Sequence, residues 1–251
     1  MIQRAATLGL FAACVLAHAA SASDAPTAED VVWGCDDAGY VLPTTEYKHA
    51  VLGDDIEYKG LFLLIHTATG VLPATFELPE GQVYEDIAPR CGDLDGDGDA
   101  EVVAVVSDAK VGARLAVYDK QRGPIDETPP IGRGFRWLAP VGIADVDGDG
   151  QNDVAYVETP HIGGALRVWT LVDGKLTEIA NAAGFSNHRI GEDFITGGMR
   201  DCGSGTEMIV PAFDWSELLS VRMEGSSLVR RTISGETDLA TVERALECEI
   251  D

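Results

Sequence analysis

The sequence predicts an all-β protein, and an internal repeat is the first observation behind this prediction. CGDLDGDGDAEVVAVV begins at Cys91 and ADVDGDGQNDVAYVE begins at Ala144, so that Asp93 aligns with Asp145, 52 positions further on. Behind each acidic stretch the same order recurs: an apolar run, a short turn and a second apolar run. Repeats of about 40–50 residues with about four strands each are typical of propeller blades. The repeat therefore predicts a small β-propeller.

Val-rich runs bounded by Gly, Pro and Asp are the second observation, because this punctuation is typical of strands. The expected strands are EVVAVVS (101–107) and ARLAVYD (113–119) in the first copy, DVAYVE (153–158) and ALRVWTL (165–171) in the second, and PIDETPPI (124–131) and FRWLAPVGIAD (135–145) between them. Each copy thus supplies strands for one four-stranded blade, which must stack on neighbouring blades to bury both of its faces.

A third, weaker copy follows the clear pair. Aligning Glu207 with Glu101 places Asp201 at the second acidic position of the loop. Met199 then replaces the first acid and Gly203 the third. We therefore expect strands here, but no metal site.

A fourth copy precedes the pair, because residues 46–65 are expected to carry two strands without the acidic loop. Degenerate repeats are expected at the ends of such an array. Residues 23–235 therefore divide into four four-stranded blades, or five if the N-terminal segment contributes.

The tail, residues 236–251, has a different pattern. Apolar residues recur at helical spacing over residues 239–246, and Thr237 or Asp238 is the expected N-cap. We expect a short C-terminal helix that docks on the β domain, with Cys248 as a tie.

The net charge of the chain limits the classes of partner that it is expected to bind. The 251 residues contain 42 Asp and Glu but 18 Lys and Arg, which gives a formal net charge of −24. The basic residues are scattered, whereas binding to nucleic acid phosphates requires a concentrated basic patch. Nucleic acids and anionic membrane surfaces are therefore disfavoured, and cations or basic partners are favoured.

The N-terminus has the features of an export signal. Arg4 precedes the apolar run AATLGLFAACVLA, and ASA at positions 20–22 is a small-residue cleavage site. The run of 13 residues is too short to span a bilayer, and no later segment is long enough. We expect residues 1–22 to be removed after Ala22 and the mature chain to be periplasmic or secreted. The alternative is a lipoprotein processed before Cys14.

Four cysteines follow the signal: Cys35, Cys91, Cys202 and Cys248. An even number in an exported chain suggests two disulfides, with three possible connectivities. We expect neighbours to pair, Cys35 with Cys91 and Cys202 with Cys248. A zinc site is the alternative, and the lack of a CxxC pair or a paired His spacing disfavours it.

The two acidic loops are candidate calcium sites, with about two Ca²⁺ per chain. Both fit the pattern D-x-D-G-D-G-x-x-[DE], in which clustered carboxylates repel one another unless a cation lies between them. Ca²⁺ accepts 6–8 oxygen ligands in flexible geometry. The candidate ligands are Asp93, Asp95, Asp97, Asp99 and Glu101 in the first loop and Asp145, Asp147, Asp149, Gln151 and Asp153 in the second. Asp99 and Gln151 are expected to contribute their backbone carbonyls.

An EF-hand is excluded, because its loop requires a Glu at position 12 and a helix after it. Position 12 is here Ala104 or Tyr156, inside strand-like runs. DLDGDGDAEVVAVV and DVDGDGQNDVAYV instead resemble FG-GAP / VCBS repeats, the blade motif of integrin-α-type β-propellers. The resemblance implies that each Asp loop links two strands and binds Ca²⁺. It extends loosely over residues 46–224, where the Phe-Gly piece of the motif is missing.

No catalytic residue is assigned from the sequence. His161 lies in an expected surface turn, and His49, His66 and His188 are separated in sequence and match no metal motif. Ser204, in CGSGTE, lacks the GxSxG pattern of a nucleophile turn.

The tryptophans divide into expected core residues and one candidate contact residue. Trp137 and Trp169 lie in expected strands and are assigned to the core. Trp215, in FDWSE, is the best candidate for stacking on a sugar or peptide.

The sequence therefore predicts a secreted calcium-binding propeller that acts as a non-catalytic binding module for a protein or glycan. A secreted hydrolase or lyase on a propeller scaffold is the first alternative, for which Arg133, Arg136 and His161 would have to converge in a cleft. A structural or adhesion component of a surface assembly is the second. The fold alone does not choose among them.

Overall fold

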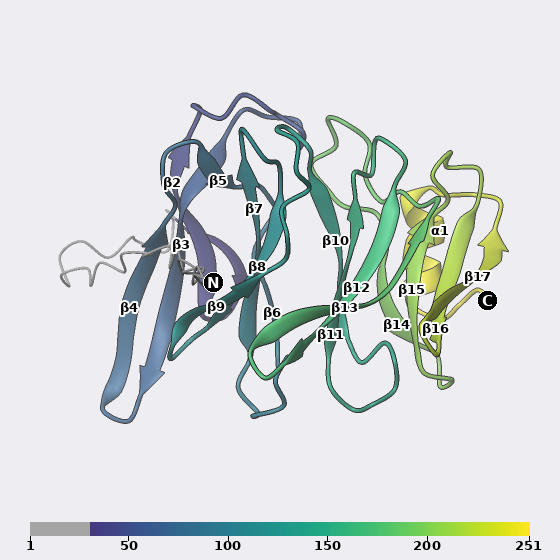
Figure 1. Ribbon diagram of the computed structural model, residues 1–251. Coiled ribbons are helices and arrows are strands. Elements are labelled where there is room, and N and C mark those ends of the chain that lie inside the picture. Colours follow the sequence, from purple (N-terminus) through teal and green to yellow (C-terminus); the bar gives the residue numbers. More distant parts are fainter. Residues whose placement is uncertain (1–30) are drawn as a thin grey trace, which may run out of the picture.

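The computed structural model describes residues 31–251 as strands β1 to β17 followed by one helix, α1 (Figure 1). The predicted all-β class with a short C-terminal helix is confirmed. The expected signal peptide, its cleavage after Ala22 and the alternative at Cys14 lie outside the described residues.

The strands form four antiparallel groups. The first contains β1 (Val32–Cys35), β2 (Ala38–Thr44), β3 (Glu57–Thr67) and β4 (Gly70–Glu77). The second contains β6 (Arg90–Gly92), β7 (Glu101–Asp108), β8 (Arg114–Asp119) and β9 (Gly123–Glu127). The short strand β5 (Gln82–Tyr84) pairs with both β3 and β7, and so joins the two groups into one nine-stranded sheet.

The third and fourth groups are separate four-stranded meanders. The third contains β10 (Leu138–Ala144), β11 (Asp153–Glu158), β12 (Ala165–Val172) and β13 (Lys175–Ala183). The fourth contains β14 (Gly198–Asp201), β15 (Thr206–Pro211), β16 (Leu218–Glu224) and β17 (Ser227–Ser234). The six strands expected in and between the two clear repeats are all present.

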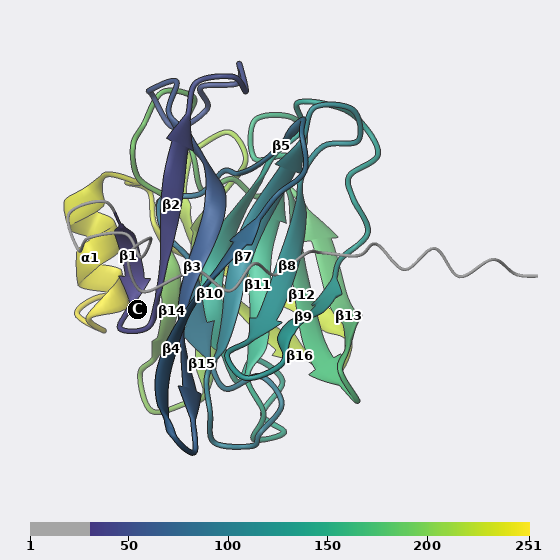
Figure 2. The ribbon, with the colours of Figure 1, turned by 90° about the vertical axis from the view of Figure 1, so that its left-hand side faces the viewer.

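The four groups lie side by side in chain order, with the first and the fourth at opposite ends of the row (Figure 1). Figure 2 looks along this row, so that the sheets lie one behind another. β10 contacts β6 on one side and β14 on the other, and β13 likewise lies between β9 and β17. Each group corresponds to one expected blade, whereas closure into a ring stays a prediction.

The core fills the spaces between successive groups, and β7 shows how. Val102, Ala104 and Val106 face the cluster shared with the first group, whereas Val103 and Val105 face the cluster shared with the third. Both faces of β7 are therefore buried. This is why its sequence is a continuous apolar run without polar alternation.

One expected strand position is wrong. Residues 46–65 were predicted to carry two strands, but residues 46–56 form a loop, and the one strand in this stretch, β3, begins at Glu57. Gly53 has a left-handed φ of +94°, and the Asp54 carboxylate accepts a hydrogen bond from the Ile56 backbone. Such a side-chain-to-backbone turn competes with strand pairing.

The helix α1 (Leu239–Leu246) covers the free face of the fourth group (Figure 1). Asp238 is the N-cap, because its carboxylate accepts from the Thr241 backbone at 3.1 Å. Val242 and Ala245 pack on Ile209 of β15. Leu239 was expected on the apolar face but is 48% exposed.

The two disulfides join Cys35 to Cys91 and Cys202 to Cys248, so the expected neighbour pairing is confirmed. Two disulfides indicate an oxidising compartment, outside the cell or in the periplasm. Within residues 31–251, no helix is long and apolar enough to cross a membrane. Trp137 and Trp169 belong to the core, as expected.

Candidate metal centres

Both acidic loops lie at tight turns between paired antiparallel strands. The first connects β6 to β7 and the second connects β10 to β11, and each strand pair continues directly from its loop. Gly98 and Gly150 both have φ of +93°, a conformation that residues with a Cβ adopt at a cost. The expected arrangement of loop and strand, without a following helix, is confirmed.

Three carboxylates converge in each loop. In the first loop Asp93, Asp95 and Glu101 each place an oxygen within 4.8 Å of the others. In the second loop Asp145, Asp147 and Asp153 do the same. An oxygen-only set of this kind fits a hard divalent cation.

The last acid of each cluster is buried at the start of its strand. Glu101 and Asp153 are each 1% exposed. Burial, together with the neighbouring Asp147, raises the pKa of Asp153 to about 6, and burial likewise raises the pKa of Glu101. A cation between the carboxylates would stabilise their charged forms, so the residues present fit the metal that the motif implies.

Backbone donors hold the first acid of each loop in place. Asp93 accepts from the backbone N–H groups of Gly96 and Gly98, at 2.7 and 3.1 Å. Asp145 accepts from those of Gly148 and Gly150, at 2.7 and 3.0 Å. The two loops therefore have the same hydrogen-bonded shape.

The closing acids are anchored in matching ways. One oxygen of Glu101 accepts from the Leu94 backbone at 2.7 Å, and one oxygen of Asp153 accepts from the Val146 backbone at 3.0 Å. Each carboxylate thus fastens its loop to the following strand and keeps a second oxygen for an ion.

The other predicted ligands lie outside the two clusters. Asp97 and Asp149 each accept from the backbone N–H two residues later, at 2.9 and 2.8 Å. Asp99 accepts from the Gln121 side chain at 2.9 Å. The Gln151 side chain turns away from its loop and donates to the Leu94 and Leu171 carbonyls, so a ligand role for its backbone carbonyl stays a prediction.

An arginine distinguishes the first loop from the second. The Arg122 guanidinium lies 3.6 Å from Asp95 and 3.4 Å from Asp97, and Asp119 holds its Nε at 2.7 Å. Among the ion pairs of residues 31–251, none involves an acid of the second loop. Arg122 therefore partly neutralises the first loop alone.

The second loop also touches the first. Gln151 donates from its side chain to the Leu94 carbonyl at 2.6 Å, and Asn152 donates to the Asp93 carbonyl at 2.9 Å. Asp93 is itself a member of the first carboxylate cluster. The two candidate metal centres are thus joined through backbone that belongs to one of them.

The stretch that contains both loops matches a known protein-family repeat. Residues 93–156 match the FG-GAP-like repeat. The match begins at the first acid of the first loop and ends within β11, so it includes both carboxylate clusters. It confirms the resemblance to FG-GAP / VCBS-type repeats. No curated protein matches the chain.

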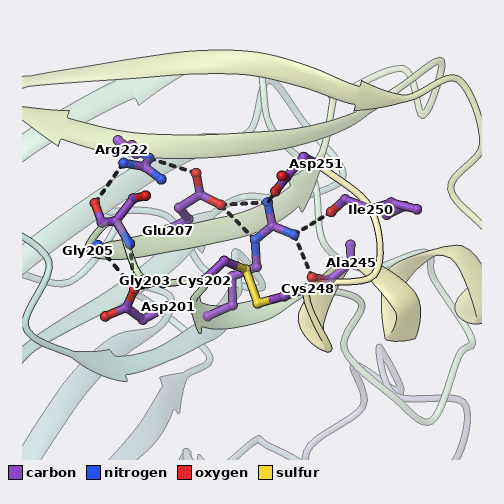
Figure 3. Close-up of a disulfide and its surroundings, with 12 residues drawn as sticks. Asp201, Cys202, Gly203, Gly205, Glu207, Arg222, Ala245, Cys248, Ile250 and Asp251 are labelled. Atoms are coloured by element: carbon purple, nitrogen blue, oxygen red, sulfur yellow. Dashed lines mark hydrogen bonds and ion pairs between the residues drawn. A yellow bond between two sulfur atoms is a disulfide. The ribbon is translucent and has the colours of Figure 1, made fainter.

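The third loop lies beyond the FG-GAP-like match and holds an arginine where the others hold a carboxylate cluster (Figure 3). Glu207 occupies the position of Glu101 and Asp153. Its two oxygens accept from Arg200 Nε at 2.7 Å and from Arg222 Nε at 2.6 Å. Although burial opposes it, these hydrogen bonds lower the pKa of Glu207.

A disulfide and the helix complete this third junction. Cys202 lies in the loop and bonds to Cys248, directly after α1 (Figure 3). Arg200 Nη1 donates to the carbonyls of Ala245 and Ile250, at 2.6 and 2.7 Å, close to the C-terminal end of the helix. Ser204 belongs to this turn, where its backbone N–H donates to Asp201 at 3.1 Å.

Sequence reasoning missed a group of histidines at the other end of the sheets from the FG-GAP-like loops. β11 begins at the second acidic loop and ends shortly before His161, whose Nε2 lies 2.9 Å from His188 Nδ1. His49 lies on the same cavity as His161. No local spacing indicates this cluster, because its members come from three distant loops.

The three residues named for the catalytic alternative do not all line one cavity. Arg136 and His161 line one cavity, whereas Arg133 does not line it. His66 lies apart, 3.2 Å from Asp37. Trp215, the expected contact residue, is half-buried beneath the Arg189 guanidinium, which lies 3.7 Å from its ring centre.

Proposed function

We propose that this chain is a calcium-binding module of the propeller type that acts outside the cytoplasm and binds a protein or glycan without catalysing a reaction on it. The pair of matching carboxylate clusters carries the proposal. The FG-GAP-like match over both loops supports it, because this repeat is a feature of propeller-type binding modules.

The donor set supports calcium over other metals. Both clusters offer carboxylate oxygens from a flexible Gly-rich turn, whereas Zn²⁺ prefers His and Cys ligands and Mg²⁺ requires a near-ideal octahedron. Asp93, Asp95, Glu101 and the Asp99 carbonyl would hold one ion. Asp145, Asp147, Asp153 and the Gln151 carbonyl would hold the other.

The proposed role of the ion is to fasten strands. Each cluster spans a turn between two paired strands, and its closing acid belongs to the second of them. Binding to the folded state alone stabilises it, by about 2.7 kcal/mol per site at a hundredfold excess over the dissociation constant. The two disulfides add covalent fastening of a kind that persists outside the cytoplasm.

Thermal unfolding with and without chelator tests the calcium role. The full mature chain is stripped with EDTA and then unfolded in EDTA, in excess Ca²⁺ and in excess Mg²⁺. We expect Ca²⁺ to raise the midpoint strongly and Mg²⁺ to raise it weakly. An equal midpoint in EDTA and in Ca²⁺ would contradict the proposal.

The binding role is tested separately from the metal. Immobilised chain is exposed to a glycan array and to extracellular extract, in Ca²⁺ and in EDTA, and bound species are then measured with purified components. We expect a saturable complex that Ca²⁺ strengthens, without turnover of the bound ligand. Chemical conversion of a bound glycan would contradict the non-catalytic role.

A further inference from the structure

A small cavity lies at the end of the sheets opposite to the acidic loops. It has a volume of about 180 Å³, and its walls include His49, Phe135, Arg136, Thr159 and His161. These residues come from the loops after β2, β9 and β11. Its size suits a ligand with about one ring, since drug-sized sites are larger.

The His49 ring is held in place by a hydrogen bond to a buried carboxylate. Its Nδ1 lies 2.6 Å from Oε1 of Glu85, which is 0% exposed. The Trp137 indole N–H donates to the Glu85 backbone carbonyl at 2.8 Å, which fixes the backbone that carries this carboxylate. With Nδ1 hydrogen-bonded to a carboxylate, Nε2 is the nitrogen of His49 left for a ligand.

The protonation of His161 follows from a chain of hydrogen bonds. His188 Nε2 lies 2.9 Å from the Glu192 carbonyl, which can only accept, so His188 donates from Nε2 and accepts at Nδ1. His161 must then donate from Nε2 to His188, and its own Nδ1 keeps a lone pair. Burial, with His188 and His49 nearby, lowers the pKa of His161 to about 4, which keeps this ring neutral.

Arg136 brings positive charge to the cavity wall. Within residues 31–251 the arginine ion pairs do not include Arg136, although the chain carries a large excess of acids. Arginine binds carboxylates through paired N–H groups. An anionic ligand would therefore find an unpaired partner here.

Backbone strain is concentrated at the same cavity. Phe135 and Thr159 have φ of +53° and +50°, although neither is glycine and Thr159 is β-branched. Strained residues of this kind cluster at ligand and active sites, where the surrounding structure holds them. The Phe135 side chain is 43% exposed and offers an apolar surface at the cavity.

We propose that this cavity binds a small carboxylate ligand that also bears hydroxyl groups. Arg136 would take the carboxylate, His161 Nδ1 would accept from a hydroxyl, and Phe135 would cover an apolar face of the ligand. The proposal names a ligand class for the binding role above and rests on that role. None of the cavity residues belongs to a candidate calcium cluster, so calcium would act on this site only by stabilising the folded chain.

Three sugars that differ in charge test the proposal: glucuronate, glucose and glucosamine. Each is titrated into the calcium-loaded mature chain, and the imidazole ¹⁵N signals of His49 and His161 are followed by NMR. We expect glucuronate to shift both histidines saturably, glucose to bind at least tenfold more weakly and glucosamine not to bind. Equal affinities for glucuronate and glucose, or no shift with any sugar, would overturn the proposal.

Two arginine variants separate the site from general charge. Arg136→Gln should lower glucuronate affinity about 10- to 100-fold, because it removes a charge-assisted pair. Arg133→Gln makes the same charge change three residues away, off the cavity wall, and should leave the affinity unchanged. Equal losses in both variants would contradict the assignment of Arg136. The calcium-dependent rise in melting midpoint, measured on the same samples, shows whether the calcium proposal stands independently.

Discussion

Arg200 donates to Glu207 at the position where the two acidic loops bring carboxylates together. The Arg200–Glu207 contact is 2.7 Å, and both side chains are about 1% exposed. The Arg200 guanidinium is a fixed positive charge. It lies at the position where the first and second acidic loops place carboxylates that could hold a metal cation. In the fourth group of strands, residues of the chain itself therefore hold the loop in place, with the Cys202–Cys248 disulfide beside them.

Glu207→Gln should therefore destabilise the chain equally with and without calcium. The substitution leaves the buried Arg200 charge without its carboxylate, a change that costs about 3–5 kcal/mol at buried pairs. Urea unfolding in Ca²⁺ and in EDTA measures the loss. Arg244→Gln, at an exposed pair with Glu249, is the control and should change little. A loss that appears only in Ca²⁺ would show that Glu207 acts through a metal.

Arg122→Gln should strengthen calcium binding at the first loop. The Arg122 guanidinium forms ion pairs with Asp95 and Asp97, so a calcium ion that binds these carboxylates must displace it. Exposed pairs contribute about 0.2–1 kcal/mol each, so the loss of two pairs corresponds to an affinity gain of about 2- to 30-fold. Calorimetric titration in an Asp147→Ala background isolates the first loop. Unchanged or weaker binding would mean that Arg122 does not compete with the ion.

Asn152→Ala should weaken the first site although Asn152 is not a ligand. Its side chain donates to the Asp93 carbonyl, and without it the first loop loses a contact worth about 0.5–1.5 kcal/mol. We expect a two- to tenfold loss in calcium affinity at the first loop, measured in the same Asp147→Ala background. Asn181→Ala, on β13, is the matched control. If both variants bind equally well, the loops are not coupled through this contact.

Glu57→Gln should make the chain more stable at alkaline pH. Burial, with Glu85 hydrogen-bonded beside it, raises the pKa of Glu57 from 4.5 to about 9. Between these values the folded chain holds a proton that the unfolded chain has released, so the stability contributed by this group falls as the pH rises. The glutamine side chain can still donate an N–H to Glu85, but it has no proton that titrates.

Urea unfolding of Glu57→Gln and the parent chain at several pH values checks this prediction, in constant Ca²⁺. The variant should be the more stable near pH 8, and the gap should narrow toward pH 5. Glu77→Gln, at an exposed position on β4, should show no such trend. A gap that does not depend on pH would contradict the raised pKa of Glu57.

The features that the sequence predicted correctly depend on short stretches of chain. The acidic loop, the strand after it and the turn to the next strand lie within one repeat, so residue order and spacing determine them. The cap at Asp238 is likewise local to α1. The cysteine pairing is not local in this sense, because the disulfides span 56 and 46 residues, and neighbour pairing was one of three possible connectivities.

The features that it missed depend on how distant loops meet. His49, His161 and His188 approach one another because the loops after β2, β11 and β13 lie at the same end of adjacent sheets. Arg122 reaches the first loop from the turn between β8 and β9. These contacts depend on the register and twist of the sheets, which no short motif encodes. The loop at residues 46–56 was mistaken for a strand because its apolar residues outweighed the turn at Asp54.

Calcium stoichiometry tests the central claim most directly. Calorimetry or metal analysis of the EDTA-stripped, reloaded mature chain should give about two Ca²⁺ per chain. Asp95→Ala and Asp147→Ala should each retain about one, because each removes a member of one cluster, and the double variant should retain none. A parent chain that binds no calcium, or variants that keep the parent stoichiometry, would contradict the account.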